Sequence, residues 1–442
     1  MGVKTRRFFA WTGLVLLAVI ALGLGIRAFF NYSNGKKLER YLAALGSKGM
    51  IADASALVQS CPDPDNAALL WKAAESLFIL EPKDKSLLAP VSDVSGWKDF
   101  SPEEQKRLEA IIDKNRKAID LYLEASGKSC FQYGDPARPP LERETPDFSL
   151  MIQATRLVIV DALLKAEKGQ AEEAVGQILR GICLMKLCSG SPVLLNYLVS
   201  MANAKMLVHN LNRVVAGTEL PAATLAGMLD SLDAASWRKA MVKAFQAEHA
   251  GFSLETYHQL LKGKTITGVN SDLPGRIYFW VIRPVLKSEA IWVSRHFEEM
   301  IQSAHEPFYR NEKARQWLGQ EIQVPARYKL AGLLLPNLYT VILKEATLEA
   351  FLEAARIGLA CRVYRSRKGI YPDKVADLVP DILKEEPLDP FTGQPLTYKS
   401  RGDAFIVYSL GSNGKDDSGR MSVMTQAVME KDDDWSWREN WQ

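Results

Sequence analysis

The sequence predicts a mainly α-helical protein with an N-terminal transmembrane helix, a body of paired antiparallel helices and a small C-terminal α+β module that contains a β-hairpin. Three observations support this fold class. An uncharged apolar run opens the chain, apolar residues then recur every three or four positions along most of its length, and alternating strand patterns occur only near the C-terminus.

Composition and charge indicate a folded protein and argue against a nucleic-acid partner. Of the 442 residues, 47% are hydrophobic and 24% are charged, which is ordinary for a globular protein and excludes a disordered or collagen-like chain. The 55 Lys and Arg residues, set against 52 Asp and Glu, give a formal charge of +3. Binding to a phosphate backbone requires a denser positive charge, so we expect no nucleic acid to bind.

The N-terminal segment, residues 1–30, is predicted to be a single-pass membrane anchor. Residues 8–26 carry no charge and approach the roughly 20 apolar residues that cross a bilayer core. Lys4, Arg6 and Arg7 precede this run, so the positive-inside rule predicts a cytoplasmic N-terminus in the cytoplasmic (inner) membrane and an extracytoplasmic body. A cleaved signal peptide is the alternative, but the run exceeds the usual apolar length of such peptides.

Two later apolar stretches are too short to span a bilayer. Residues 277–282 lie between two arginines, and residues 330–343 are broken by Pro336. We expect both to be buried or interfacial helix segments, so the sequence predicts one membrane crossing.

The helical body is expected over residues 31–343 and begins with a polar linker at residues 31–37. Asn66 is a predicted N-cap, because a run with helical apolar spacing follows it. Ser101 and Glu104 form a predicted capping box around a proline at the first helical position. These signals are typical of surface helices with one buried stripe.

A helical hairpin is the clearest local pattern in the body. A helix from Pro146 to about Lys168 is followed by a turn at Gly169 and a second helix that ends before Gly190. This hairpin resembles a tetratricopeptide repeat in style, but no second copy follows at a fixed period. We therefore expect stacked helical pairs, which form an interaction scaffold by default because such stacks present extended grooves.

Residues that could carry chemistry are few. Glu248, His249 and His258, with Glu255 between them, could hold a metal ion or move protons, although Gly251 is expected to interrupt their helix. A hydrogen-bonded polar face is the alternative interpretation.

Two further patterns are expected to be inert. Ser95 begins an SxxK string that lacks the partner motifs of penicillin-binding proteins, so we expect no catalytic role for it. Of the five cysteines, Cys183 and Cys188 lie five residues apart in an apolar helical run, a spacing that neither zinc knuckles nor CxxC redox motifs use. In an oxidising compartment at least one cysteine would stay unpaired, and we expect free cysteine here to be buried and unreactive.

The C-terminal module is expected over residues 344–430. A long helix ends at Gly369, a short helix follows Pro372, and a turn at 389–393 leads into two strands at 395–399 and 404–410. The last residues, 431–442, form an acidic tail with three Trp. We expect it to be frayed, with docking to a partner as the alternative.

Within this module the strings GIYPDKVADLVP and LDPFTGQPLTYKSRGDAFIVYSLGSNGKDDSG resemble the soluble domain of the type II secretion major pseudopilin (G-type). The whole chain also resembles uncharacterised membrane-anchored helical envelope proteins of planctomycete-type bacteria. Residues 8–26 lack the pseudopilin polymerisation motif GF[ST]LxE and its Glu, so the resemblance does not extend to assembly into a pilus.

The pseudopilin resemblance implies a calcium site in the final loop. The matching positions are the Leu410 carbonyl and Asn413, where the family usually has Asp, with Asp416 and Asp417 in place of later acidic ligands. Oxygen ligands suit calcium, and fewer carboxylates weaken such a site. A plain surface turn built on Asn413–Gly414 is the alternative.

Taken with the anchor, these features predict a non-enzymatic, envelope-anchored scaffold that contacts envelope or secretion proteins. The alternative is an extracytoplasmic hydrolase or ligand-binding protein with its site near Glu248, His249 and His258.

Overall fold

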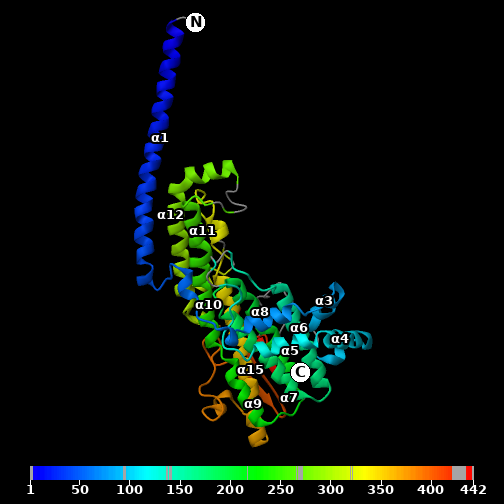
Figure 1. The fold of residues 1–442 in the computed structure, drawn as a ribbon. Coiled ribbons are helices and arrows are strands. Elements are labelled where there is room, and N and C mark those ends of the chain that lie inside the picture. The colour runs from blue at the N-terminus through cyan, green and yellow to red at the C-terminus, as the bar shows by residue number, and fades with distance from the viewer. Residues whose placement is uncertain are drawn as a thin grey trace. The chain divides into compact units, whose positions relative to one another are not determined.

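The protein is mainly helical, with one small antiparallel sheet (Figure 1). The computed structural model describes residues 3–92, 96–135, 138, 142–216, 218–264, 266, 272–318, 320, 322–420 and 435–440. The chain forms two compact units. The first comprises residues 1–56, 246–301 and 321–337, and the second comprises residues 57–245, 302–320 and 338–442. Each unit is built from segments that are distant in the sequence.

The first unit begins with helix α1, Val3–Ala44. Its part from Trp11 onward is the one helix among the described residues that is long and apolar enough to cross a membrane. The most apolar stretch has a mean hydropathy of 2.3, and none of it is buried against the protein. An apolar surface of this length needs a lipid environment or a partner to leave water.

Helix α1 continues through residues 31–37, where a polar linker was expected. The backbone carbonyl of Asn31 accepts a hydrogen bond from Lys287 Nζ at 2.9 Å, and Asn34 Nδ2 donates to the Pro284 carbonyl at 2.8 Å. These contacts stabilise helix in a stretch of weak helix formers, so tertiary structure overrides local propensity here.

The rest of the first unit packs around α12, Leu273–Ala304, which runs beside α1 in Figure 1. This unit also contains a π-helical segment, Glu248–Leu254, and the helices α11, Glu255–Leu261, and α14, Ala331–Leu334. The carboxylate of Glu289 on α12 accepts hydrogen bonds from the backbone N–H groups of Leu330 and Ala331 at 2.6 and 2.7 Å. This carboxylate ties α14 to α12 at the point where the helix leaves N–H groups unpaired.

The second unit contains most of the helices. They are α2 Ala67–Glu75, α3 Pro82–Leu88, α4 Pro102–Lys114, α5 Arg116–Ala125, α6 Phe148–Glu167, α7 Ala171–Ser189, α8 Leu194–Val215, α9 Ala222–Leu229, α10 Ala235–Ala247 (whose last two residues belong to the first unit), α13 Glu312–Gln316 and α15 Tyr339–Lys368.

Both N-caps expected from the sequence are confirmed. The Asn66 side chain accepts from the Ala68 N–H at 3.0 Å. Ser101 and Glu104 form the reciprocal capping box, in which the Glu104 carboxylate accepts from the Ser101 N–H at 2.8 Å.

The expected helical hairpin is α6 and α7, joined at Gly169, whose φ of +77° suits glycine in the turn. At Gly181 a Cβ atom would lie 2.9 Å from the Leu207 side chain of α8, so glycine allows α7 and α8 to pack closely. The residues 330–343 that were tested as a membrane span instead belong to α14 and the start of α15.

The C-terminal region forms a three-stranded antiparallel sheet in the order β1-β2-β3. Strands β1, Thr397–Arg401, and β2, Ala404–Ser409, form the expected hairpin. Strand β3, Trp435–Glu439, pairs with β2, and this corrects the expectation of a frayed tail. The sheet contacts α15: Gly358 faces the Trp437 ring, and Arg362 lies 3.0 Å from the Glu439 carboxylate.

Candidate functional site

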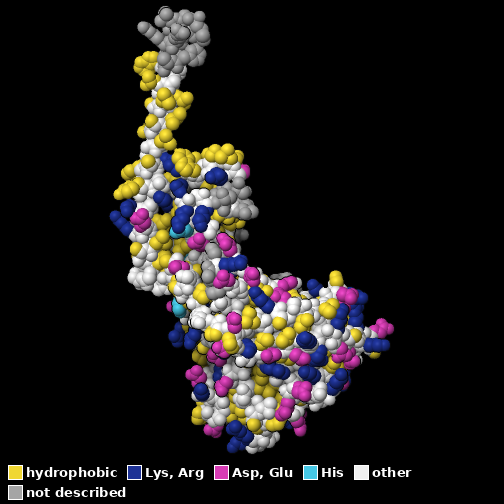
Figure 2. Space-filling view, viewed as in Figure 1, with side chains coloured by type: hydrophobic (Ala, Val, Ile, Leu, Met, Phe, Trp, Pro, Cys, Tyr) yellow, Lys and Arg dark blue, Asp and Glu magenta, His cyan; other side chains and the backbone are white. Residues whose placement is uncertain are grey.

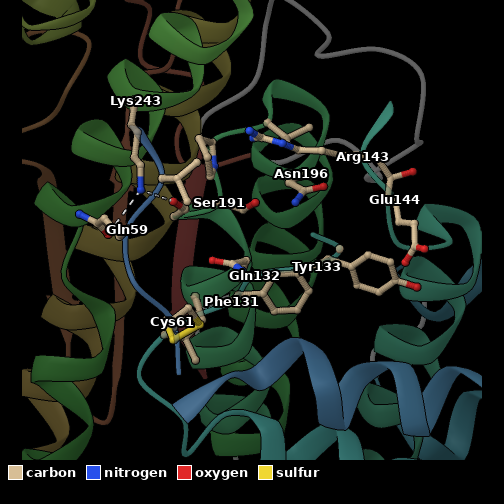
Figure 3. Close-up of a pocket in the computed structure, with 18 of the residues that line it drawn as sticks. Gln59, Cys61, Phe131, Gln132, Tyr133, Arg143, Glu144, Ser191, Asn196 and Lys243 are labelled. Atoms are coloured by element: carbon tan, nitrogen blue, oxygen red, sulfur yellow. Dashed lines mark hydrogen bonds between the residues drawn. A yellow bond between two sulfur atoms is a disulfide. The ribbon is translucent and has the colours of Figure 1, made fainter. Parts of the chain in front are cut away.

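A pocket of about 190 Å³ lies in the second unit, beside the disulfide between Cys61 and Cys130 (Figure 3). The loop after Cys130, the residues that connect α7 to α8, and Lys243 of α10 form its walls. The lining side chains that Figure 3 labels are Gln59, Cys61, Phe131, Gln132, Tyr133, Arg143, Glu144, Ser191, Asn196 and Lys243.

Asn66 fixes the wall that contains Gln132. Its Nδ2 donates to the Gln132 carbonyl and its Oδ1 accepts from the Gln132 N–H, both at 3.0 Å. The Ala67 N–H donates to the Cys130 carbonyl at 2.9 Å. The Asn66 side chain thus has two roles, because it caps the N-terminus of α2 and also holds the pocket loop at Gln132.

Tyr133 forms a second wall and is held at both ends. Its hydroxyl donates to Glu75 Oε2 at 2.7 Å, and the Lys72 ammonium lies 4.4 Å from the centre of its ring. Lys72 also pairs with Glu144 at 2.9 Å. Burial and the neighbouring Glu75 carboxylate raise the pKa of the Tyr133 phenol, so this side chain is a neutral, fixed surface.

The pocket lining carries more positive than negative charge. Lys243 Nζ donates to the Gly190 carbonyl at 2.9 Å and contacts Gln59 Oε1 at 3.4 Å, and burial lowers its pKa. Arg143 and Lys186 add two further cations, whereas Glu144 is the one carboxylate among the lining residues that are described. Such a surface favours a ligand with a negative charge.

Asn196, at the start of α8, supplies an acceptor without a partner. The side chain is 4% exposed, and its Oδ1 has no hydrogen-bond partner among the described residues. In Figure 3 it lies between Gln132, Tyr133 and Arg143. A buried polar atom left unpaired costs about 1–3 kcal/mol.

The residues predicted to form a hydrolytic or metal site lie in the first unit and face different surroundings. Glu248 is half-buried, and burial raises its pKa to about 7. His249 is fully buried, lies 3.0 Å from Ser294 Oγ through its Nε2, and has its pKa lowered to about 4 by burial. His258 is exposed and lines a separate cavity of about 130 Å³ beside Glu255.

The backbone around these residues differs from the expectation. Gly251 does not interrupt the helix: α10 passes into the π-helical segment and then into α11. A π-helix changes the angular spacing of side chains, so positions derived from an α-helix do not apply here. Within the described part of the chain, no three His, Cys, Asp or Glu side chains form a group that could hold a metal ion. Ser95 lies outside the described residues.

The proposed calcium loop contains the expected residues, and several of their oxygens already have partners. Asn413 Oδ1 accepts from the Lys415 N–H at 2.8 Å, and Asn413 Nδ2 donates to Asp417 Oδ2 at 3.2 Å. Asp416 Oδ1 accepts from the Tyr408 hydroxyl at 2.8 Å, and its Oδ2 lies 3.7 Å from the Lys399 ammonium. The oxygen donors suit calcium in kind, but a cation would have to compete with Lys399 for Asp416.

The Asp389 carboxylate holds the start of this loop by hydrogen bonds, a role that the sequence pattern did not indicate. Its carboxylate is buried and accepts from Ser409 Oγ and from the N–H groups of Phe391 and Leu410, at 2.8–2.9 Å. The signal in the sequence is the aspartate that opens the DPFTG turn, where the local pattern indicates only a turn.

A row of buried carboxylates on α15 was also missed. Glu345, Glu349 and Glu353 occupy one helical face, and Arg238 on α10 contacts the first two. Burial raises the pKa of Glu345 to about 8 and that of Glu353 to about 7. One guanidinium between two carboxylates leaves one of them without a full counter-charge, so burial favours its protonated form.

Two of the five cysteines are paired, and the other three are free. Cys61 and Cys130 form a disulfide across 69 residues, whereas Cys188 and Cys361 are buried thiols and Cys183 is a half-buried one. The spacing of two cysteines so far apart in the sequence gives no sign that they pair.

No protein-family model, curated protein or solved structure matches this chain. What the chain does is therefore argued from its own residues.

Proposed function

We propose that this chain is a non-enzymatic binding protein, anchored in the cytoplasmic membrane by α1, whose pocket beside the Cys61–Cys130 disulfide holds a small hydroxylated anion. The observation that carries this proposal is the unpaired Asn196 oxygen in a pocket lined by Arg143, Lys186 and Lys243. A positively charged lining selects an anion, and the amide oxygen selects a hydroxyl or N–H donor on the same molecule.

The size and walls of the pocket narrow the ligand class. A volume of about 190 Å³ is below the range of drug-sized sites, so the occupant is about as large as one sugar ring. Phe131 and Tyr133 are stacked, with ring centres 6.5 Å apart, and provide apolar faces for such a ring. A uronic acid combines the carboxylate, the hydroxyls and the ring in one molecule.

The extracytoplasmic location of the pocket is part of the proposal. The exposed apolar helix α1 supports an anchor, and the disulfide supports an oxidising compartment, where such bonds form and persist. A cytoplasmic N-terminus follows from Lys4, Arg6 and Arg7 before the apolar run.

The scaffold role and the link to secretion belong to the same proposal. The order of α15, the β1–β2 hairpin and the loop at 410–417 supports a pseudopilin-like module, and the helical pair α6–α7 supports a surface for envelope partners. Activity at Glu248, His249 and His258 is less favoured, because His249 is fully buried and His258 is exposed.

Calorimetric titration of the detergent-solubilised full chain tests the ligand. We expect glucuronate to bind and the neutral sugar glucose to bind at least tenfold more weakly. Asn196→Ala should abolish binding without lowering the melting temperature, because Asn196 Oδ1 has no partner in the described part of the chain to lose. Unaltered glucuronate affinity in Asn196→Ala would contradict the assignment.

Two lysine variants on α10 distinguish binding in the pocket from non-specific attraction to surface charge. Lys243→Met removes a pocket cation, whereas Lys239→Met removes an exposed lysine one turn away on the same helix. Affinity for glucuronate should fall about tenfold in the first variant and stay constant in the second. Equal losses in both would point to non-specific attraction.

A further inference from the structure

We propose that the N-terminal part of α12, residues 273–283, lies in the surface of the bilayer that α1 crosses, with its apolar side chains among the lipids. This inference rests on the proposed membrane anchor and adds a second contact between the protein and the same membrane. We name these residues the interfacial segment.

The side chains of the interfacial segment are apolar and yet face solvent. The exposed fractions are 68% for Leu273, 55% for Ile277, 48% for Trp280 and 50% for Val281. Large apolar side chains gathered in this way are costly in water and mark a surface that contacts a protein or a membrane. Figure 2 shows hydrophobic side chains together at this end of the first unit, beside α1.

A contact with α1 places the segment at the level of the membrane surface. Arg27 is the first charged residue after the apolar run, so it marks the depth at which α1 leaves the hydrocarbon. Its guanidinium carbon lies 3.6 Å from the centre of the Trp280 ring, and its Nη2 donates to the Trp280 carbonyl at 2.6 Å. The interfacial segment is therefore held beside the end of the membrane span.

The direction of the segment also fits a position in the plane of the bilayer surface. In Figure 1 the N-terminal part of α12 runs across the direction of α1, and the rest of α12 runs alongside it. Pro284 lies within this helix. A proline within a helix removes a hydrogen bond and bends the axis. Asn34 on α1 donates to the Pro284 carbonyl at 2.8 Å, which fixes the bend against the anchor.

The residue types are those of a membrane interface. Tyr278, Phe279 and Trp280 are consecutive, and aromatic rings of this kind gather at the headgroup level of membrane proteins. Arg276 and Arg283 flank them, and basic residues beside apolar and aromatic ones are typical of helices that lie in a bilayer surface. The lipid surface is thus the occupant that both the apolar face and the arginines fit.

Site-specific photocrosslinking of the full chain in nanodiscs tests this inference. A photoreactive amino acid at Ile277 should form lipid adducts that mass spectrometry detects, because this side chain is exposed and faces the proposed lipid surface. The control is the same photoreactive amino acid at Leu195, an apolar side chain of the second unit that is 49% exposed. At this position we expect no lipid adducts. The replacement alters no buried side chain, so folding is not at stake.

A third position separates failure of this inference from failure of the anchor. Leu17, in the middle of the apolar run of α1, is 67% exposed and should also form lipid adducts. Adducts at Leu17 without adducts at Ile277 would overturn the interfacial segment and leave the anchor. Absence of adducts at both would overturn the anchor. Crosslinks from Ile277 to a second copy of the chain, in place of lipid, would also contradict the inference.

Discussion

At the scale of single residues, the buried carboxylates of α15 determine how stability depends on pH. Glu345 is buried, and its nearest cation, Arg238, also contacts Glu349. The folded chain therefore binds a proton at Glu345 more tightly than the unfolded chain does. The contribution of this proton to the free energy of unfolding is fully present below pH 4.5, the pKa of Glu345 in the unfolded chain. It is lost as the pH rises through about 8, the pKa of Glu345 in the folded chain.

Glu345→Gln should remove this dependence. Glutamine has the shape of protonated glutamate and does not ionise. As the pH rises from 5 to 8, we therefore expect the melting temperature of the wild type to decrease relative to that of the variant. Differential scanning calorimetry across this range measures the effect, with the exposed Glu124→Gln on α5 as the control. A constant difference between wild type and Glu345→Gln would show that Arg238 compensates the carboxylate fully.

The sequence predicted backbone roles of single residues better than side-chain environments. The caps at Asn66 and Ser101 and the turn at Gly169 were predictable because each depends on a few neighbouring residues. The unpaired oxygen of Asn196 and the burial of Glu345 were not, because both depend on elements far away in the chain.

At the scale of elements, the packing of the sheet on α15 depends on Gly358. A Cβ atom at this position would clash with the Trp437 ring of β3. We expect Gly358→Ala to destabilise the protein by about 1–3 kcal/mol, as overpacking of a close contact does.

A second glycine provides the matched control. Gly176 lies within α7 and has open space around its missing Cβ. Gly176→Ala should stabilise the helix by up to about 1 kcal/mol, because alanine loses less backbone entropy on folding. Thermal unfolding followed by circular dichroism measures both variants. Stabilisation by both would show that β3 does not rest on α15.

The loop at 410–417 provides a second prediction at this scale, which concerns calcium. We expect millimolar calcium to raise the melting temperature of the full chain relative to chelator, since a ligand that binds the folded state stabilises it. Lys399→Gln should enlarge the increase, because the ammonium lies 3.7 Å from Asp416 Oδ2. Asp416→Asn combined with Asp417→Asn should abolish it. Equal melting temperatures with calcium and with chelator would leave the loop a plain turn.

Elements close in sequence were predictable, and pairings across distance were not. The α6–α7 hairpin and the β1–β2 hairpin follow from local turns. The sequence indicates a frayed end at strand β3, because its partner β2 lies about 30 residues earlier and residues 435–439 carry no turn signal that links them.

At the scale of the whole molecule, sequence and structure agree on one long apolar helix near the N-terminus and on a mainly helical chain. The grouping of residues 1–56 with 246–301 and 321–337 had no local signal. It depends on contacts such as the one between Tyr41 and Glu298, whose side chains lie 2.9 Å apart. Periodicity identifies a buried face of a helix but not the helix that covers it.

The last prediction concerns the side of the membrane on which the body lies. If the body is extracytoplasmic, Cys61 and Cys130 are oxidised in cells and the other three cysteines remain thiols. Alkylation in denaturant of protein trapped directly from cells should therefore modify three cysteines and leave one disulfide-linked peptide pair. Five modified cysteines would place the body in the cytoplasm and reverse the topology. Cys61→Ser combined with Cys130→Ser should lower the free energy of unfolding by up to about 4 kcal/mol, because the disulfide closes a loop of 69 residues. Cys183→Ser, at a half-buried thiol, is the control and should change the free energy of unfolding far less.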